Sequence, residues 1–313
     1  MPYRSLGRCG TKVSALGLGG WTTFGGSVTD NALVRSILLG AFDAGINFFD
    51  IADIYAKGAS ERAMGEVLRE LPRHELVIST KAYWPMSDDV NDRGLSRKHI
   101  MESVEKSLKR IGTDYLDLYF CHRFDAQTPI EETARAMDDL VHQGKVLYWG
   151  TSEWTGAEVR EAHAICHRLN LYRPQVEQPQ YSLLARQKFE DDVAPACQEL
   201  AMGTVVWSPL ASGMLTGKYD DGVPDGSRLA RIDWLKESVY TEANRQKVLK
   251  FGALANELGI SRTQLALAWA LAHPAVSSVI LGATRPEQLA ENLGALQVAM
   301  DPALCQRLAA LLA

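Results

Sequence analysis

The sequence lacks the features that mark several classes of protein. It has no apolar run long enough to span a membrane and no basic tract, and its first ten residues carry no signal-peptide hydrophobic segment. The net charge of -5, from 33 basic and 38 acidic residues, argues against a nucleic-acid surface. We therefore expect a protein that binds neither nucleic acids nor membranes.

Cysteines are few, and their spacing does not suggest pairs. The five cysteines stand far apart in the sequence, at Cys9, Cys121, Cys166, Cys197 and Cys305. An odd, dispersed set is typical of reduced thiols in the cytoplasm. We therefore expect a cytoplasmic protein.

Complete phosphate-binding glycine motifs are missing as well. Gly17-Leu18-Gly19 is followed by Thr22, where the dinucleotide fingerprint has a third glycine. The run from Gly213 to Lys218 resembles a P-loop but is one residue short. We interpret both as ordinary turns. This disfavours a doubly wound open sheet, because that fold normally binds phosphate at an early turn.

The chain does contain a regular alternation of strand-like and helix-like patterns, and its 46% hydrophobic content is ample for a large core. A hairpin is predicted from Tyr3 to Leu6 and from Lys12 to Leu16. Strands are then expected at 16–20, 47–52, 76–81, 116–122, 146–151, 175–181, 204–207 and 279–281, with helices between them. This alternation predicts the α/β class, as a (β/α)₈ TIM barrel with an N-terminal β-hairpin and extra C-terminal helices. We expect a single domain over residues 1–313.

One segment interrupts the alternation. Residues 213–240 are rich in Gly, Asp and Arg and are predicted to form a long loop. A loop of this length inside a compact domain is usually a lid or a binding loop. The last segment, 302–313, is predicted to be an amphipathic helix on the outside of the domain.

Four polar residues fall at the ends of three successive predicted strands. They are Asp50, Tyr55, Lys81 and His122. In a parallel barrel, the carboxyl ends of the strands build the active site. A nearby ammonium lowers the pKa of a tyrosine, an aspartate can hold that ammonium, and a histidine can hydrogen-bond a carbonyl oxygen. Together the four residues predict protonation of a carbonyl oxygen by Tyr55 while a hydride reaches the carbon.

Single residues allow other interpretations. Each of the four, taken alone, is more often a turn, packing or solvated residue, and only their joint placement favours catalysis. Lys81 alone also fits a Schiff-base lyase. His163 and His167 have the i, i+4 spacing of zinc ligands on a predicted helix. Because no third ligand is evident, we expect a solvated helix face and no metal site.

At these positions the chain resembles the aldo-keto reductase family. The matching stretches are 49–55, 79–81, 118–122, 150–154, 177–181, 207–210 and 282–292, which follow the family order and cover nearly the whole chain. Around residues 207–219 it is most similar to the branch containing potassium-channel β-subunits and their bacterial and plant relatives. The resemblance implies an NAD(P)H-dependent reductase of small-molecule aldehydes or ketones. By this resemblance Tyr55 would donate the proton, Lys81 and Asp50 would tune the acidity of Tyr55, and His122 would orient the carbonyl of the substrate.

The resemblance also implies how the dinucleotide is bound. Ser152 and Gln178 would hold the carboxamide, and Trp207 would stack on the nicotinamide ring. The pyrophosphate would face Ser208, Leu210, Ser212 and Lys218. The adenosine phosphate and the adenine would be held by Gly282, Thr284, Arg285, Gln288 and Asn292. We include Trp21 among the cofactor-binding residues, at the substrate mouth, although simple core packing fits it equally well.

Two residues depart from the family pattern. Glu153 stands where many members have Asn and some have Arg. Gln288 stands where many members have an Arg that grips the 2′-phosphate. Arg285 and Arg228 would supply that charge, so NADP (NADPH) is the expected cofactor, and NAD is left open.

An alternative function follows from the same resemblance. The chain could be a dinucleotide-sensing regulatory subunit with little or no turnover. Channel β-subunits typically carry Asn at the position of His122, whereas most active reductases carry His, so His122 favours an enzyme. The channel-related branch includes tetramers, and the oligomeric state is left open.

Overall fold

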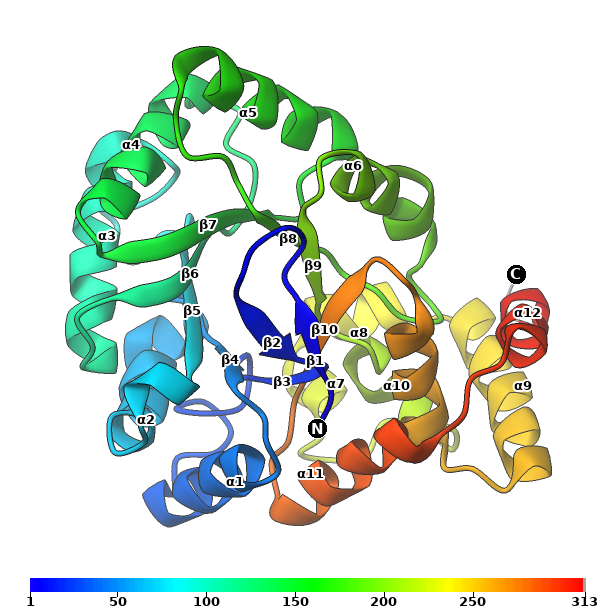
Figure 1. Ribbon diagram of the computed structural model, residues 1–313. Coiled ribbons are helices and arrows are strands. Elements are labelled where there is room, and N and C mark those ends of the chain that lie inside the picture. The colour runs from blue at the N-terminus through cyan, green and yellow to red at the C-terminus, as the bar shows by residue number, and fades with distance from the viewer. Residues whose placement is uncertain (312–313) are drawn as a thin grey trace.

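The computed structural model describes residues 1–311 and contains a closed barrel of eight parallel strands, in the order β10-β3-β4-β5-β6-β7-β8-β9 (Figure 1). The barrel strands are β3 (Leu16–Gly19), β4 (Phe48–Asp50), β5 (Val77–Ala82), β6 (Leu116–Cys121), β7 (Val146–Ser152), β8 (Val176–Gln178), β9 (Gly203–Val206) and β10 (Val276–Leu281). This architecture confirms the predicted (β/α)₈ barrel and excludes the open, doubly wound sheet.

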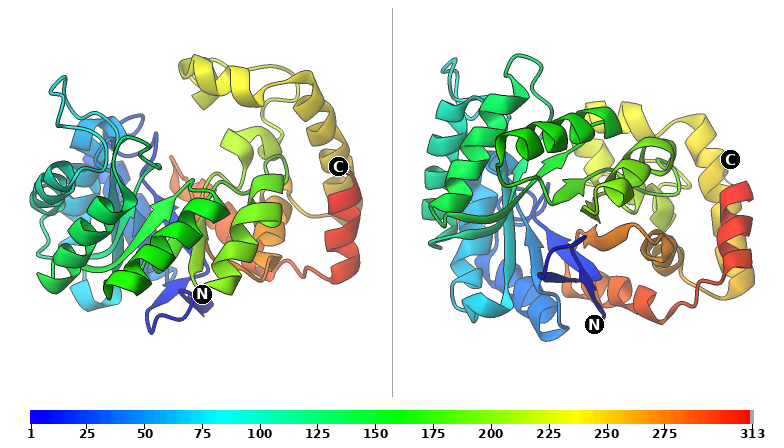
Figure 2. Two further views of the ribbon diagram at one scale, coloured as in Figure 1. Left: turned by 90° about the horizontal axis from the view of Figure 1, so that it is seen from above. Right: turned by 45° about the horizontal axis from the view of Figure 1, so that its top comes forward.

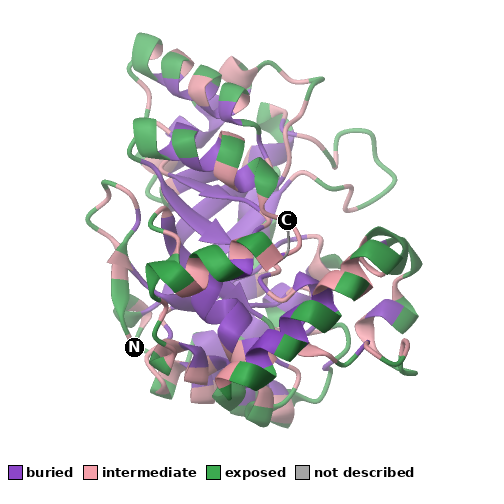
Figure 3. Ribbon diagram, turned by 90° about the vertical axis from the view of Figure 1, so that its right-hand side faces the viewer, coloured by how far each residue is buried: buried purple, intermediate pink, exposed green. Residues whose placement is uncertain are grey.

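Helices cover the outside of the barrel. They are α1 (Asn31–Asp43), α2 (Ala59–Leu68), α3 (Arg97–Ile111), α4 (Ile130–His142), α5 (Gly156–Leu169), α6 (Ala194–Glu199), α9 (Glu242–Leu258), α10 (Arg262–Ala272), α11 (Pro286–Leu293) and α12 (Pro302–Leu311). Every residue of β5 and β6 is buried, as expected for strands covered on both faces. Most of these helices bury one stripe and expose the other side, whereas α10 is buried almost throughout (Figure 3).

Side-chain caps determine where several helices begin. The Asp30 carboxylate accepts a hydrogen bond of 2.8 Å from Ala32 N at the start of α1. Ser96 caps α3, and Thr155 forms a capping box with Glu158 at the start of α5. These polar side chains satisfy amide groups that have no partner within the helix, so they position the helix relative to the preceding strand end.

The N-terminal hairpin closes the barrel at the end opposite to the strand carboxyl ends. It consists of β1 (Tyr3–Ser5) and β2 (Lys12–Ser14), which lie across the barrel in Figure 1. Leu6 and Val13 are fully buried in one cluster with barrel residues such as Phe48 and Val77. The turn needs glycine at position 7, because its φ is +58° and a Cβ would lie 2.4 Å from the backbone nitrogen of Gly203.

The segment 213–240 is more ordered than the sequence predicts. It contains most of the 3₁₀ turn η4 (Ala211–Thr216) and two short helices, α7 (Arg228–Arg231) and α8 (Asp233–Val239). Ser227 caps α7, and Leu229 and Leu235 are buried against the barrel core. The prediction of a loop is therefore wrong in part. The helical turns in this segment are held by a few apolar residues, and they are too short to show a helical period in the sequence.

Helices α9 and α12, from the last third of the chain, lie at one edge of the barrel. Figure 2 shows α9 and α12 side by side there, and Arg307 of α12 pairs with Glu257 of α9 at 2.6 Å. The helical segment between β8 and β9 is divided into a π turn (Phe189–Val193) and α6, and the segment after β10 is divided into α11 and the 3₁₀ turn η5 (Gly294–Gln297). Leu312 and Ala313, which were included in the last predicted helix, lie outside the described residues. Within residues 1–311, no helix is long and apolar enough to cross a membrane.

Candidate active site

The four predicted catalytic residues meet at the carboxyl ends of neighbouring strands. Asp50 ends β4, Lys81 lies near the end of β5, His122 follows β6, and Tyr55 lies in the turn η1 (Tyr55–Gly58) after β4. The Lys81 ammonium lies 2.7 Å from Asp50 Oδ2 and 3.2 Å from the Tyr55 hydroxyl. The Tyr55 and His122 rings meet edge to face, with centroids 5.8 Å apart. Strand order thus brings together residues that are separated by up to 72 positions (122 - 50) in the sequence.

The buried ion pair of Lys81 and Asp50 has a full set of partners. Besides Asp50, Lys81 Nζ donates to the carbonyl of Ile51 at 2.6 Å. Asp50 Oδ1 accepts from Ser79 Oγ at 2.7 Å and from Gln178 Nε2 at 2.9 Å. Because charge buried without partners is costly, these bonds hold both groups in one geometry. Lys81 is fully buried and engaged by three acceptors, which disfavours the Schiff-base alternative.

Burial sets the protonation states of Tyr55 and His122. Desolvation, and then the charge of Asp50, raise the pKa of Tyr55 well above its ordinary value. Desolvation and the charges of Lys81 and Arg123 lower the pKa of His122 well below its ordinary value. Tyr55 therefore keeps its proton and His122 is neutral. The expected lowering of the Tyr55 pKa by the Lys81 ammonium is not seen: the charge that lowers this pKa is that of Arg123, and desolvation outweighs it.

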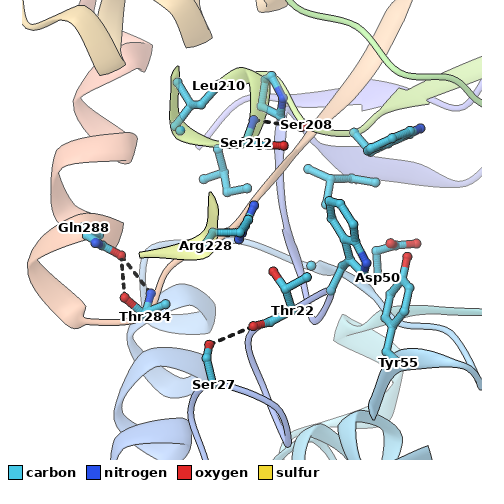
Figure 4. A pocket seen from close by; sticks show the side chains of 18 of the residues that line it. Thr22, Ser27, Asp50, Tyr55, Ser208, Leu210, Ser212, Arg228, Thr284 and Gln288 are labelled. Atoms are coloured by element: carbon cyan, nitrogen blue, oxygen red, sulfur yellow. Dashed lines mark hydrogen bonds between the residues drawn. The ribbon is translucent and has the colours of Figure 1, made fainter. Parts of the chain in front are cut away.

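A cavity of about 710 Å³ extends from these residues to the end of β10. In Figure 4, Tyr55 and Asp50 lie at one end, Gln288 and Thr284 lie at the other, and Arg228 lies between them. All the residues predicted to contact the dinucleotide line this cavity: Trp21, Ser152, Gln178, Trp207, Ser208, Leu210, Ser212, Lys218, Arg228, Gly282, Thr284, Arg285, Gln288 and Asn292. Asp50, Tyr55 and His122 line it too, whereas Lys81 lies behind Asp50 and Tyr55.

The backbone is bent sharply where it borders the cavity. Glu153, Ser208, Ala211 and Ser212 all have positive φ values, between +47° and +61°. Such conformations are unfavourable outside glycine and concentrate at binding and catalytic sites. Ser212 is buried, and its hydroxyl has no hydrogen-bond partner among the described residues. The chain after β9 thus forms a curved wall with an unused polar group.

Two tryptophans lie together in the cavity lining. The rings of Trp21 and Trp207 meet edge to face, with centroids 5.7 Å apart. Trp207 Nε1 donates to Glu153 Oε1 at 2.9 Å. Glu153 also accepts from Gln180 N at 2.5 Å and from Lys188 Nζ at 3.1 Å. The unusual acid at position 153 is therefore committed to protein contacts that orient Trp207.

The far end of the cavity is polar and cationic. Gln288 Oε1 accepts from Thr284 N at 2.8 Å and from Thr284 Oγ1 at 3.1 Å (Figure 4). Asn292 Nδ2 donates to the carbonyl of Gly282 at 3.4 Å. Between this end and Tyr55, Arg228 lies over the Trp21 ring, 5.6 Å from its centroid, and pairs with no carboxylate in the described part of the chain. Burial lowers its pKa, so a bound anion would relieve an unfavourably buried charge.

Several residues of the site were not predicted from the sequence. Trp84, Arg123, Arg231 and Trp234 also line the cavity. Arg123 directly follows His122 and could have been found from its strand-end position. Trp234 is carried by the short helix α8, for which the sequence has no clear periodic signal.

The histidine pair on α5 does not behave as predicted. His167 is exposed, but His163 is buried, and burial lowers its pKa to about 4. The solvated face expected there is therefore wrong for His163, which lies on the same side of α5 as Val159, Ala162 and Cys166. Among residues 1–311, no group of three or more His, Cys, Asp or Glu side chains could hold a metal ion.

Comparison with known proteins agrees with this geometry. Residues 15–313 match the model of the aldo/keto reductase family. A relative from Arabidopsis thaliana, named "Probable voltage-gated potassium channel subunit beta", is 47% identical over 303 residues, which cover 95% of this chain and 92% of the relative. A relative from Oryza sativa subsp. japonica with the same name is 46% identical over 303 residues, with the same coverage.

Proposed function

Because this chain belongs to the aldo/keto reductase family, we propose that it is an NADPH-dependent oxidoreductase that reduces aldehydes or ketones to alcohols. The observation that carries the proposal is the contact of Lys81 Nζ with both Asp50 and the Tyr55 hydroxyl, at one end of a long cavity. The family is one of oxidoreductases that generally bind nicotinamide dinucleotides. The proposed setting is the cytoplasm, with the chain acting as one domain.

The cavity has the properties that a dinucleotide requires. It is elongated, it carries cations at the end away from Tyr55, and the wall around Ser212 has an unpartnered hydroxyl. Ser152 and Gln178 would hold the carboxamide, Trp207 would stack on the nicotinamide, and the segment 208–218 would face the pyrophosphate. Arg285 and Arg228 would hold the 2′-phosphate in place of an arginine at position 288. When bound, the reduced nicotinamide supplies a hydride to the carbonyl carbon.

The side chains at the strand ends would handle the proton. Tyr55 keeps its phenolic proton at neutral pH and donates it to the carbonyl oxygen as negative charge develops there. Lys81, at 3.2 Å, then stabilises the phenolate, and Asp50 holds Lys81 in place. A neutral His122 can donate one N–H to the same oxygen and aim it at Tyr55. Trp21, Trp84 and Trp207 limit water at the reacting carbon.

A second function, from a different class, is favoured by the names of the relatives. The Arabidopsis and rice proteins are named as probable potassium-channel β-subunits. On this alternative, the chain binds dinucleotide and reports its redox state to a partner, with little or no turnover. The histidine at position 122 favours the enzyme, because channel β-subunits typically carry Asn there.

Paired titrations with NADPH and NADH, followed by absorbance decay with a panel of small aldehydes, test the proposal. We expect tighter binding of NADPH and multiple turnovers with at least one activated aldehyde. A protein that oxidises one equivalent of dinucleotide once, and then turns over no aldehyde or ketone, would instead support the regulatory subunit. A protein that binds neither dinucleotide would contradict both functions.

A further inference from the structure

We propose that Arg123 forms a carboxylate-binding subsite at the substrate end of the cavity, so that aldehydes carrying a carboxylate are preferred substrates. The inference rests on the proposed function, because it names the substrate class of the same site. It concerns a residue to which the carbonyl chemistry assigns no role. Its basis is the position, the anchoring and the free donors of one guanidinium.

Arg123 lies on the opposite side of the barrel from the adenosine end. It follows His122 at the end of β6, and it lines the cavity. In the barrel order, β6 is four strands from β10 in one direction and four in the other. The remaining cations of the lining belong to the segments after β9 and β10: Lys218, Arg228, Arg231 and Arg285. Among the cations of the lining, Arg123 is the one that directly follows His122 at its strand end.

The guanidinium of Arg123 is anchored but not neutralised. Arg123 Nη1 donates to the backbone carbonyl of His122, and the guanidinium carbon lies 5.6 Å from the Trp84 ring centroid. No Asp or Glu within the described residues pairs with it. Asp125, two residues further on, is already engaged by Leu95 N at 2.8 Å and Thr128 Oγ1 at 2.7 Å. Since a guanidinium has five N–H donors in a rigid fork, Arg123 retains donors that match a carboxylate.

The charge of the cavity also favours an anionic substrate. The chain as a whole has a net charge of -5, but the cavity lining has five basic and two acidic side chains. One of the two acids, Asp50, is neutralised by Lys81 at 2.7 Å, and the other is Glu291. The Arg123 charge also contributes to the lowered pKa of both His122 and Lys81, so it acts at the reacting position. A bound carboxylate would offset this charge without displacing any pair already present.

The walls around Arg123 indicate the shape of the substrate. Trp84, which is 37% exposed, stands next to His122 with ring centroids 6.3 Å apart. Trp21 and Trp207 line the same cavity and contact each other edge to face. Flat aromatic or short aliphatic aldehydes would fit between them, with the carbonyl at Tyr55 and the carboxylate at Arg123.

The test compares p-formylbenzoate with its neutral methyl ester in the full-length protein with NADPH. We expect the parent protein to have a kcat/KM for the carboxylate at least about 10-fold above that for the ester. Arg123→Gln should lower kcat/KM for the carboxylate roughly 10- to 100-fold, as expected for one charge-assisted contact, mainly through KM. The value for the ester should change less than about 3-fold, and Arg123→Lys should retain part of the preference. Arg93→Gln, which removes an exposed charge outside the cavity lining, is the matched control.

A binding measurement separates this inference from the proposed function. Calorimetry with the product analogue p-hydroxymethylbenzoate and NADP⁺ needs no turnover. Weaker binding to Arg123→Gln than to Arg93→Gln supports the subsite even if no aldehyde is reduced, in which case only the reductase proposal fails. The subsite is overturned if the parent protein prefers the ester. It is also overturned if Arg123→Gln lowers kcat/KM equally for both substrates, because Arg123 would then only support the backbone at His122.

Discussion

The indole nitrogen of Trp207 donates a hydrogen bond of 2.9 Å to the carboxylate of Glu153. The two residues come from the ends of different barrel strands, β9 and β7, and Glu153 adopts a φ of +61° to make the contact. The same carboxylate binds Gln180 N and Lys188 Nζ, so one acid joins three segments around the proposed nicotinamide site. In this chain, the carboxylate at position 153 therefore orients the Trp207 indole.

Glu153→Ala should therefore disturb Trp207 more than the barrel. We expect NADP⁺ to quench the protein fluorescence less in this variant and to bind roughly 10- to 100-fold more weakly, because one hydrogen bond to a charged group contributes about 1.5–3 kcal/mol. Glu153→Gln, which keeps an acceptor for the indole, should recover most of the quench. Trp207→Ala sets the baseline. A normal quench in Glu153→Ala would show that packing alone orients Trp207.

Tyr55→Phe should remove most carbonyl reduction and leave NADPH binding nearly unchanged. The phenol is the proposed proton source, and the phenyl ring still fills the space beside His122. Steady-state turnover and a fluorescence titration measure the two effects separately. Tyr83→Phe removes a phenol outside the cavity lining and serves as the control. Turnover near that of the parent protein would exclude Tyr55 as the proton donor.

His122→Asn should lower turnover by about 10²–10³, the usual effect of losing one well-placed donor to a developing oxyanion, with little change in the dissociation constant of NADPH. The pH profile adds a second readout. Since burial and the charges of Lys81 and Arg123 hold the pKa of His122 well below its ordinary value, His122 stays neutral through the neutral range. We expect no inflection of kcat near pH 6.5 in the parent protein. An inflection there that disappears in the Asn variant would mean that His122 acts as a cation.

Arg285→Ala and Arg228→Ala should weaken NADPH binding roughly 10- to 100-fold each and affect NADH much less, if both contact the 2′-phosphate. Arg285 is exposed at the edge of the cavity, whereas Arg228 is half-buried over Trp21. Arg62→Ala, on the outer face of α2, controls for a general loss of positive charge. Equal weakening of both dinucleotides by either variant would remove that arginine from the 2′-phosphate site.

Glu177 should make the stability of the protein depend on pH. Burial raises its pKa from 4.5 to about 8, and one of its oxygens has no hydrogen-bond partner in the described structure. At pH values between these two, Glu177 is ionised in the unfolded chain but still protonated in the folded protein. The free energy of unfolding therefore falls as pH rises, by at most about 1.4 kcal/mol per pH unit. Denaturant unfolding should give Glu177→Gln a higher free energy of unfolding than the parent protein, by an amount that grows from about pH 5 to about pH 8. Glu66 is exposed, so Glu66→Gln should show no such trend. If the difference in the free energy of unfolding between Glu177→Gln and the parent protein does not change with pH, Glu177 does not titrate in this range.

The sequence alone determined the barrel and the outline of its site. Each strand and helix has a local period of its own, and parallel strands must bring their carboxyl ends to one side, so Asp50, Lys81 and His122 could be assigned to one site. Helix caps such as Asp30 and Ser96 bind amides within three residues of themselves, so they are local features of the sequence as well.

Only the tertiary structure decided properties that depend on segments far apart in the chain. The bond from Gln178 to Asp50 joins residues 128 positions apart, and no local pattern encodes it. The helical turns in 213–240 exist because Leu229 and Leu235 are buried against the core. The burial of His163 and the raised pKa of Tyr55 depend on how completely neighbouring elements exclude water. Desolvation is a property of the assembled fold, so the sequence predicted which groups meet but not which protonation states they hold.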